Sequence, residues 1–139
     1  MVLLDTSVLI NYLRGKDNLK TRLLKEVLFK KIPVGISPFT YQEVLQGAKD
    51  KGEFDLLKHH FSKWTIYYLP ERENYEKAAE LYFELRRKGL TPRSTIDILI
   101  AITAIEYDLV LLHDDRDFDE IATFAKELRC LHSFTGQPI

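Results

Sequence analysis

The sequence predicts an α/β fold in which a mostly parallel sheet lies between two layers of helices. Short apolar strands alternate with helical segments, and the strands are apolar at successive positions, as in parallel sheets that are covered on both faces. No internal repeat and no Pro-, Gly- or Ser-rich linker interrupts the 139 residues. We therefore expect a single domain over residues 1–139, with ligands bound at the carboxyl edge of the strands.

Helix-end residues and apolar spacing delimit the individual elements. Gly15 follows the first helix, Asp17 or Asn18 can start the second, and Pro38 occupies the first turn of the third. Apolar and β-branched content predicts strands, in order, at 2–4, 32–37, 64–69, 109–112 and 129–132. The spacing of apolar residues predicts helices, in order, at 6–14, 18–30, 38–48, 53–62, 75–88, 94–107 and 118–127.

Composition argues against several classes of protein. Cys130 is the single cysteine, so no internal disulfide can form, and a reducing cytoplasm is the expected compartment. The longest apolar stretch, residues 98–104, is far shorter than the roughly 20 residues that span a bilayer, so we expect no membrane segment. A formal net charge of -1 argues against a general polyanion-binding surface.

Two acids stand where the carboxyl edge of the sheet is expected. Asp5 follows the strand of residues 2–4 directly, and Asp97 lies in the first turn of a helix whose later residues are almost all apolar. A carboxylate in such a buried place needs a partner, because an unpaired charge is costly in the protein interior. Two simpler interpretations stay open, in which Asp5 only caps the following helix, or Ser94 and Asp97 form a capping box.

Helix and strand lengths return a second acidic segment to the same edge. The helix that starts near Asp97 advances roughly 15 Å, and the next strand comes back a similar distance. Asp115 and Asp117 follow that strand and should arrive beside Asp97. In the alternative interpretation the segment is a polar turn, in which Asp117 caps the last helix while Asp114 and Asp115 face solvent.

Glu43 is a further candidate, and the whole set of acids suggests a divalent cation. It lies in the helix that begins near Pro38, about 8 Å beyond the edge, where a glutamate side chain tilted toward the helix N-terminus can reach back. The alternative is an exposed helix glutamate. All-oxygen ligands favour Mg²⁺ or Mn²⁺ over Zn²⁺. The four histidines lack the spacing of a zinc site, and His113 is expected to be a neighbour of the acids, not a ligand.

Four short motifs contain these acids. In chain order they are LLDTSVLI with Asp5, FTYQEVLQG with Glu43, TIDILIAITA with Asp97, and LLHDDRDFDEIA with Asp115 and Asp117. Their order and separations resemble the PIN-domain family of metal-dependent ribonucleases, most of all the VapC-type toxins of prokaryotic toxin–antitoxin pairs. No single motif is specific, whereas the ordered combination is, and it covers essentially the whole chain. Family members often have Thr or Ser where this chain has His113.

The resemblance implies a three-layer α/β/α sandwich and an endoribonuclease that cleaves phosphodiester bonds with a metal-activated water and Mg²⁺ or Mn²⁺. The carboxylates that match the family's catalytic and metal-binding set are Asp5, Glu43, Asp97 and Asp115. Asp117 would be an additional or supporting ligand. Asp115 is preferred over Asp114 because it stands two residues before the Asp117-Phe118 pair, the offset of the family pattern.

The resemblance also implies supporting residues and partners. The hydroxyl of Thr6 or Ser7 would support the site or the scissile phosphate. Local bases expected to hold a short single-stranded RNA are Arg14, Lys16 and Arg93. Proteins of the VapC type are typically dimers that bind a small VapB-type antitoxin, so we expect a homodimer and an antitoxin partner in addition to the RNA substrate.

Three alternative functions share some of these sequence features. A phosphatase that uses Asp5 as a nucleophile needs a second aspartate two residues later, where this chain has Ser7. A PIN nuclease of RNA processing without an antitoxin is a second alternative. A non-catalytic RNA- or protein-binding scaffold of the same fold is the third, and loss of an acid would indicate it, but every expected acid is present.

Overall fold

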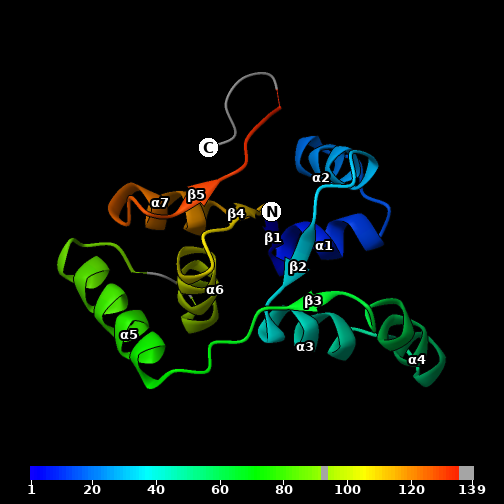
Figure 1. Cartoon of the computed structure of the whole chain (residues 1–139), viewed down its shortest axis with the longest axis horizontal. Coiled ribbons are helices and arrows are strands. Elements are labelled where there is room, and N and C mark those ends of the chain that lie inside the picture. Colours follow the sequence, from blue (N-terminus) through cyan, green and yellow to red (C-terminus); the bar gives the residue numbers. More distant parts are fainter. Residues whose placement is uncertain (92–93, 135–139) are drawn as a thin grey trace.

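A central parallel sheet organises the protein (Figure 1). The computed structural model describes residues 1–91 and 94–134. The strands of these residues are β1 Val2–Leu4, β2 Val34–Ile36, β3 Thr65–Ile66, β4 Val110–Leu112 and β5 Arg129–Cys130. They lie in the order β3-β2-β1-β4-β5, and each neighbouring pair is parallel. The predicted α/β fold with a mostly parallel sheet is confirmed.

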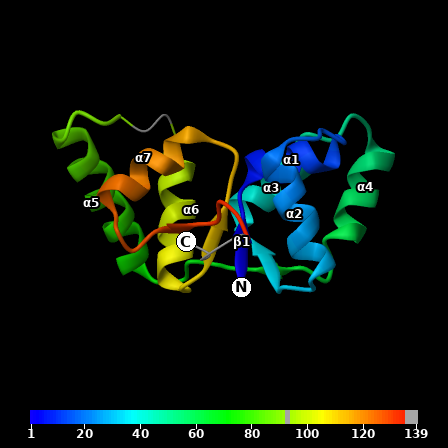
Figure 2. The same ribbon diagram turned by 90° about the horizontal axis from the view of Figure 1, so that it is seen from above.

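Helices form a layer on each face of this sheet. In chain order they are α1 Thr6–Leu13, α2 Leu19–Phe29, α3 Pro38–Gln46, α4 Lys51–His60, α5 Arg72–Arg87, α6 Thr95–Glu106 and α7 Arg116–Phe124. Figure 2 shows α1 to α4 on one side of the strands and α5 to α7 on the other. The three-layer α/β/α arrangement implied by the resemblance is therefore present.

Burial on both faces of the sheet explains why the first strand is apolar at every position. Successive side chains of a strand point to opposite faces of the sheet. Leu3 packs in the core under α5, α6 and α7, whereas Val2 and Leu4 pack in the core under α1, α2 and α3. Both faces of β1 are covered, so no position of this strand can be polar without burying a polar group.

Most elements have bounds that differ by one to three residues from those predicted, and the third strand and the last helix show why. The third strand, expected over 64–69, is only Thr65–Ile66, because it lies at the edge of the sheet and pairs only with β2. The last helix, expected over 118–127, begins at Arg116 and ends at Phe124. It begins early because Asp115 acts as its N-cap and accepts a hydrogen bond from the N–H of Asp117.

The pairing of β1 with β4 determines where the acids emerge. Leu4 is paired with Leu112, and the N–H of Asp5 donates to the carbonyl of Leu112 at 3.0 Å. Asp5 and the residues that follow Leu112 therefore leave the sheet side by side at its carboxyl edge, the edge at which open α/β sheets bind ligands.

Two expectations from composition also concern the fold. Cys130 is a buried free thiol on β5, so it contributes no disulfide. Within residues 1–91 and 94–134, every helix falls short of the length and apolar character that crossing a membrane requires.

Candidate metal centre

Asp5 is both a helix cap and a buried acid. It is the N-cap of α1, and its Oδ2 accepts hydrogen bonds from the N–H of Ser7, at 2.9 Å, and from the Ser7 hydroxyl. Only 4% of Asp5 is exposed, and burial is the main cause of its raised pKa, to which the charge of Glu43 adds. The capping interpretation is thus correct, and it is compatible with a second role because the cap orients the carboxylate at the sheet edge.

Asp97 lies in the first turn of α6, and the alternative of a capping box with Ser94 is wrong. The Ser94 hydroxyl accepts a hydrogen bond from the N–H of Ile96, at 3.1 Å, and not from that of Asp97. Burial is the largest cause of a pKa of about 7 for Asp97. The charges that raise this pKa further are those of Asp5, Asp115, Asp117 and Glu43. All the predicted acids therefore lie within electrostatic reach of Asp97.

Asp97, Asp115 and Asp117 form the closest acidic group. One carboxylate oxygen from each lies within 4.8 Å of the others. Asp115 reaches this position as the N-cap of α7, with its Oδ1 3.0 Å from the N–H of Asp117. The polar-turn interpretation is therefore wrong in two respects, because Asp115 and not Asp117 caps the helix, and Asp115 lies with Asp97 instead of facing solvent.

The two residues of the Asp114-Asp115 doublet have different surroundings. Asp114 is exposed, and its Oδ2 accepts hydrogen bonds from the side-chain amides of Asn11 and Asn18, each at 3.0 Å. Asp115, in contrast, offers an oxygen to the group with Asp97. The geometry thus agrees with the choice of Asp115 over Asp114 as the inward-facing carboxylate.

Glu43 is held at the edge by hydroxyl groups. Thr6 Oγ1 donates to Glu43 Oε1 at 2.6 Å and lies 3.0 Å from the hydroxyl of Thr40. Thr40 is buried one turn before Glu43 on α3, and its N–H donates to Ser37, the N-cap of that helix. Glu43 is therefore not a freely exposed helix glutamate. Among the described residues, Asp5 and Glu43 stand outside the closest group of three acids.

Two of the three basic residues expected to hold RNA lie in the part of the chain that the structure describes. Arg14 is exposed at the end of α1 and lines a cavity with Leu13 and Leu56, and Lys16 is exposed two residues later. Arg93 lies outside the described residues. A role for these bases in holding RNA stays a prediction.

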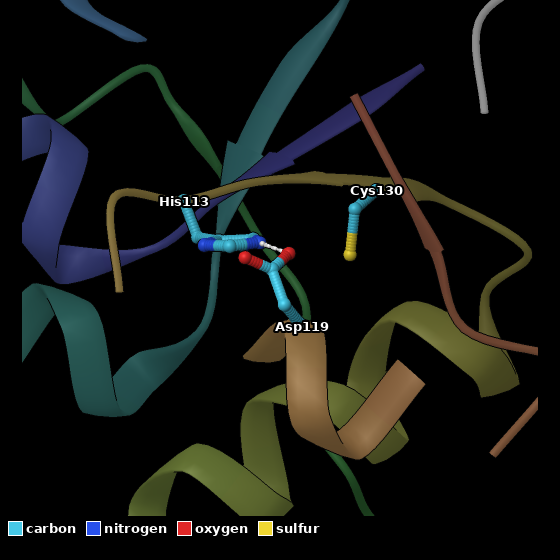
Figure 3. Close-up of side chains that lie close together, drawn as sticks. All are labelled: His113, Asp119 and Cys130. Atoms are coloured by element: carbon cyan, nitrogen blue, oxygen red, sulfur yellow. Dashed lines mark ion pairs between the residues drawn. The ribbon is translucent and has the colours of Figure 1, made fainter. Parts of the chain in front are cut away.

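His113 belongs to a second cluster, which the sequence did not indicate. Figure 3 shows His113 facing Asp119, with Cys130 beside them, and their donor atoms lie within 4.8 Å of one another. Burial lowers the pKa of His113 to about 4, so the ring is neutral near pH 7. His113 Nδ1 accepts a hydrogen bond from the N–H of Asp115 at 3.1 Å. The ring proton is therefore on Nε2, 3.3 Å from Asp119 Oδ1, and this tautomer leaves no lone pair for a metal there.

The acidic group fits a hard divalent cation. Its three donors are all carboxylate oxygens, which Mg²⁺ and Mn²⁺ accept, and the site can leave further positions to water or phosphate. The raised pKa of Asp97 is caused by burial and by other acids, so a positive charge placed among them would relieve an existing repulsion. The residues present are therefore suited to hold such an ion.

Three polar residues that contact the acids or their partners are not among the site residues predicted from the sequence. Thr40 contacts the hydroxyl that holds Glu43, and Asn11 and Asn18 bind Asp114. Spacing offered a signal for two of them, because Thr40 is one helical turn from Glu43, and Asn11 is one turn from Ser7, so each pair shares a helix face.

The fold and this site define a class of α/β/α proteins with a carboxylate centre at the edge of a parallel sheet. A family model described as PIN domain matches residues 2–123, and the chain belongs to the PIN-domain family. Two similar curated proteins are VapC ribonuclease Mb1587 of Mycobacterium bovis and Ribonuclease VapC11 of Mycobacterium tuberculosis. Each is 29% identical over 123 residues, which is 88% of this chain and 92% of the relative.

Solved structures have the same fold at lower sequence identity. A structure of VapBC2 from Rickettsia felis, bound to a promoter DNA fragment, has a TM-score of 0.71 at 22% identity and covers 92% of this chain and 96% of its own. A structure of VapBC-1 from nontypeable Haemophilus influenzae has a TM-score of 0.67 at 18% identity. It covers 88% of this chain and 94% of its own. These likenesses agree with the PIN fold.

Proposed function

We propose that this chain is a Mg²⁺- or Mn²⁺-dependent endoribonuclease, a single PIN domain over residues 1–139 that acts in the cytoplasm as the toxin of a toxin–antitoxin pair. The observation that carries the proposal is the grouping of Asp97, Asp115 and Asp117 within 4.8 Å at the carboxyl edge, in a chain of the PIN-domain family. Relatives that match 88% of the chain are named ribonucleases, which supports RNA as the substrate.

Each acid has a task in this proposal. Asp97, Asp115 and Asp117 hold the cation, and Asp5, oriented by Ser7, completes the negative site from the end of β1. A divalent cation bound there would supply positive charge to offset that of the phosphate and to acidify a bound water. Glu43, whose carboxylate is bound by the Thr6 hydroxyl, would add to this negative site from α3.

Metal dependence of RNA cleavage is the direct test. We expect the purified chain to cut a single-stranded RNA internally with Mg²⁺ or Mn²⁺, to stop when EDTA is added, and to recover with excess Mn²⁺, because a divalent cation held by the acids would supply the positive charge that offsets the phosphate. Gel analysis of a labelled RNA, with a DNA of the same sequence alongside, measures this. Cutting that persists in EDTA would refute the proposed mechanism.

We also propose that a VapB-like antitoxin docks in the groove between α1, α3 and α4, and that the toxin is a homodimer. The groove is a cavity of about 570 Å³ whose apolar lining includes Ile10, Leu13, Val44, Leu56 and Leu57. Leu13 and Leu56 are 40% and 72% exposed, and large apolar side chains around a concave surface are typical of a protein interface. The structural neighbours from R. felis and H. influenzae are VapBC structures, which supports an antitoxin as the occupant.

A charge in the groove tests the antitoxin proposal. Leu56→Glu should weaken binding of the proposed VapB-like antitoxin by about 100-fold or more, because a carboxylate would be desolvated in the interface. Leu19→Glu is the control, because Leu19 is 64% exposed on α2, outside the groove. Binding is measured by calorimetry with the purified pair, and light scattering of the toxin alone tests the dimer. Equal binding by both variants would contradict the proposed groove.

A further inference from the structure

Asp114 joins three segments of the chain at the edge of the candidate metal centre. Its Oδ2 accepts a hydrogen bond from Asn11 on α1 and another from Asn18, the N-cap of α2, each at 3.0 Å. Its backbone N–H donates to the Ser7 hydroxyl at 2.9 Å, and that hydroxyl in turn binds Asp5. The loop after β4 is thus attached to the helical layer of α1 and α2 at three points.

The backbone at this loop separates Asp114 from its neighbour. Asp115 has extended dihedral angles, φ -142° and ψ 122°, and the chain bends at Asp114, so the two neighbouring side chains reach different partners. Asp114 contacts Asn11 and Asn18 of the α1 and α2 layer, whereas Asp115 joins Asp97 of α6 and caps α7.

We propose that Asp114 is a positioning residue, which acts through its hydrogen bonds to Asn11 and Asn18 to hold Asp115 and Asp117 toward Asp97. It does not bind the metal itself. This inference rests on the proposed function only where RNA cleavage is the readout, because metal binding by the acidic group is measured separately. A carboxylate is not required for the task, since one oxygen accepts both amide hydrogen bonds.

Two substitutions separate hydrogen bonding from charge. Asp114→Asn and Asp114→Ala both remove the negative charge, but only Asn keeps an oxygen that can occupy the position of Oδ2. We expect Asp114→Ala to weaken Mn²⁺ binding about fivefold and to lower kcat/KM for RNA about tenfold, as small displacements of catalytic groups do. Asp114→Asn should stay within about threefold of the unsubstituted protein in both measurements. The exposed acid Glu120 on α7 provides the charge control, Glu120→Gln.

A double-mutant cycle tests the partner. Asn11→Ala removes one donor and leaves the Asp114 charge in place, so it should lower kcat/KM by about threefold, and its effect should largely disappear when combined with Asp114→Ala. Calorimetric Mn²⁺ titration and cleavage rates are measured on each protein, with thermal unfolding as the check of folding. If Asp114→Ala does not fold, the Mn²⁺ affinity and the cleavage rate of Asn11→Ala test the proposal instead.

Four outcomes decide between the possibilities. Rescue by Asn with non-additive loss at Asn11 supports the positioning role. If Asp114→Asn loses as much Mn²⁺ affinity as Asp114→Ala, the charge itself is needed and the proposal is overturned, as it also is if both Ala variants match the unsubstituted protein. If the unsubstituted chain binds Mn²⁺ but cleaves no RNA, the proposed function fails, and the Mn²⁺ titrations alone still judge the role of Asp114.

Discussion

Asp97→Asn is expected to reduce RNA cleavage by at least about 1,000-fold while leaving the fold intact. Asp97 supplies one of the three carboxylate oxygens of the closest acidic group, and an amide in its place lowers both the negative charge and the affinity for a divalent cation. Cleavage of a labelled RNA in saturating Mn²⁺ measures the loss, and Asp5→Asn should behave alike. Glu120→Gln, an exposed acid on α7, serves as the control with unchanged rate. Full activity in both site variants would refute the mechanism.

The same substitution should stabilise the metal-free protein at neutral and alkaline pH. Folding raises the pKa of Asp97 from 3.8 to about 7, first through burial and then through nearby acids. Between these values the folded protein holds a proton that the unfolded chain has lost, so the contribution of Asp97 to stability falls as the pH rises from about 4 to about 7.

Asp97→Asn removes this loss, and we expect its Tm in EDTA at pH 8 to exceed that of the unsubstituted chain by about 2–4 °C, a modest value because solvent screens a half-buried group. At pH 4 the two proteins should have the same Tm. A lower Tm of the variant at pH 8 would contradict a pKa of Asp97 raised by burial and nearby acids.

Phe118→Ala is expected to lower the free energy of unfolding by about 3–5 kcal/mol, or the Tm by roughly 10–15 °C. Phe118 is 0% exposed, belongs to the core under α5, α6 and α7, and its ring lies 5.0 Å from that of His113. Truncation leaves a cavity next to the N-terminus of α7, which carries the candidate ligands Asp115 and Asp117.

Urea unfolding followed by circular dichroism measures this cost. Phe29→Ala is the matched control, because Phe29 is 86% exposed at the end of α2, and its loss should change the stability by less than about 0.5 kcal/mol. Equal stability of the two variants would contradict the packing of α7 on the sheet.

Much of the fold was predictable because its signals are local. A strand that is buried on both faces must be apolar throughout, as Val2–Leu4 is, and a Pro after Ser37 marks a helix start. The short β3, Thr65–Ile66, was not predictable, because its aromatic neighbours have strand propensity but the edge position limits pairing to β2.

The candidate site was predictable in its members but not in its contacts. Strand and helix lengths were enough to return Asp115 and Asp117 to Asp97, because each element has a constant rise per residue. The assignment of the α7 cap to Asp115 was not predictable, since Asp117 is an equally good capping residue by type. The cluster of His113, Asp119 and Cys130 joins three elements, and no spacing along the chain signals it.

The sequence by itself determined that this protein is a parallel α/β sandwich and that acids follow its strands at the carboxyl edge. These properties depend on periodicity and on which residue ends each element, and both are local. Only the tertiary structure decided which way the Asp114-Asp115 doublet faces and what holds it. Asn11 and Asn18 are about 100 residues away from Asp114 in the chain, and they meet it only because β1 pairs with β4 and places α1 beside the loop. Hydrogen bonds between such distant segments exist only after the core has packed.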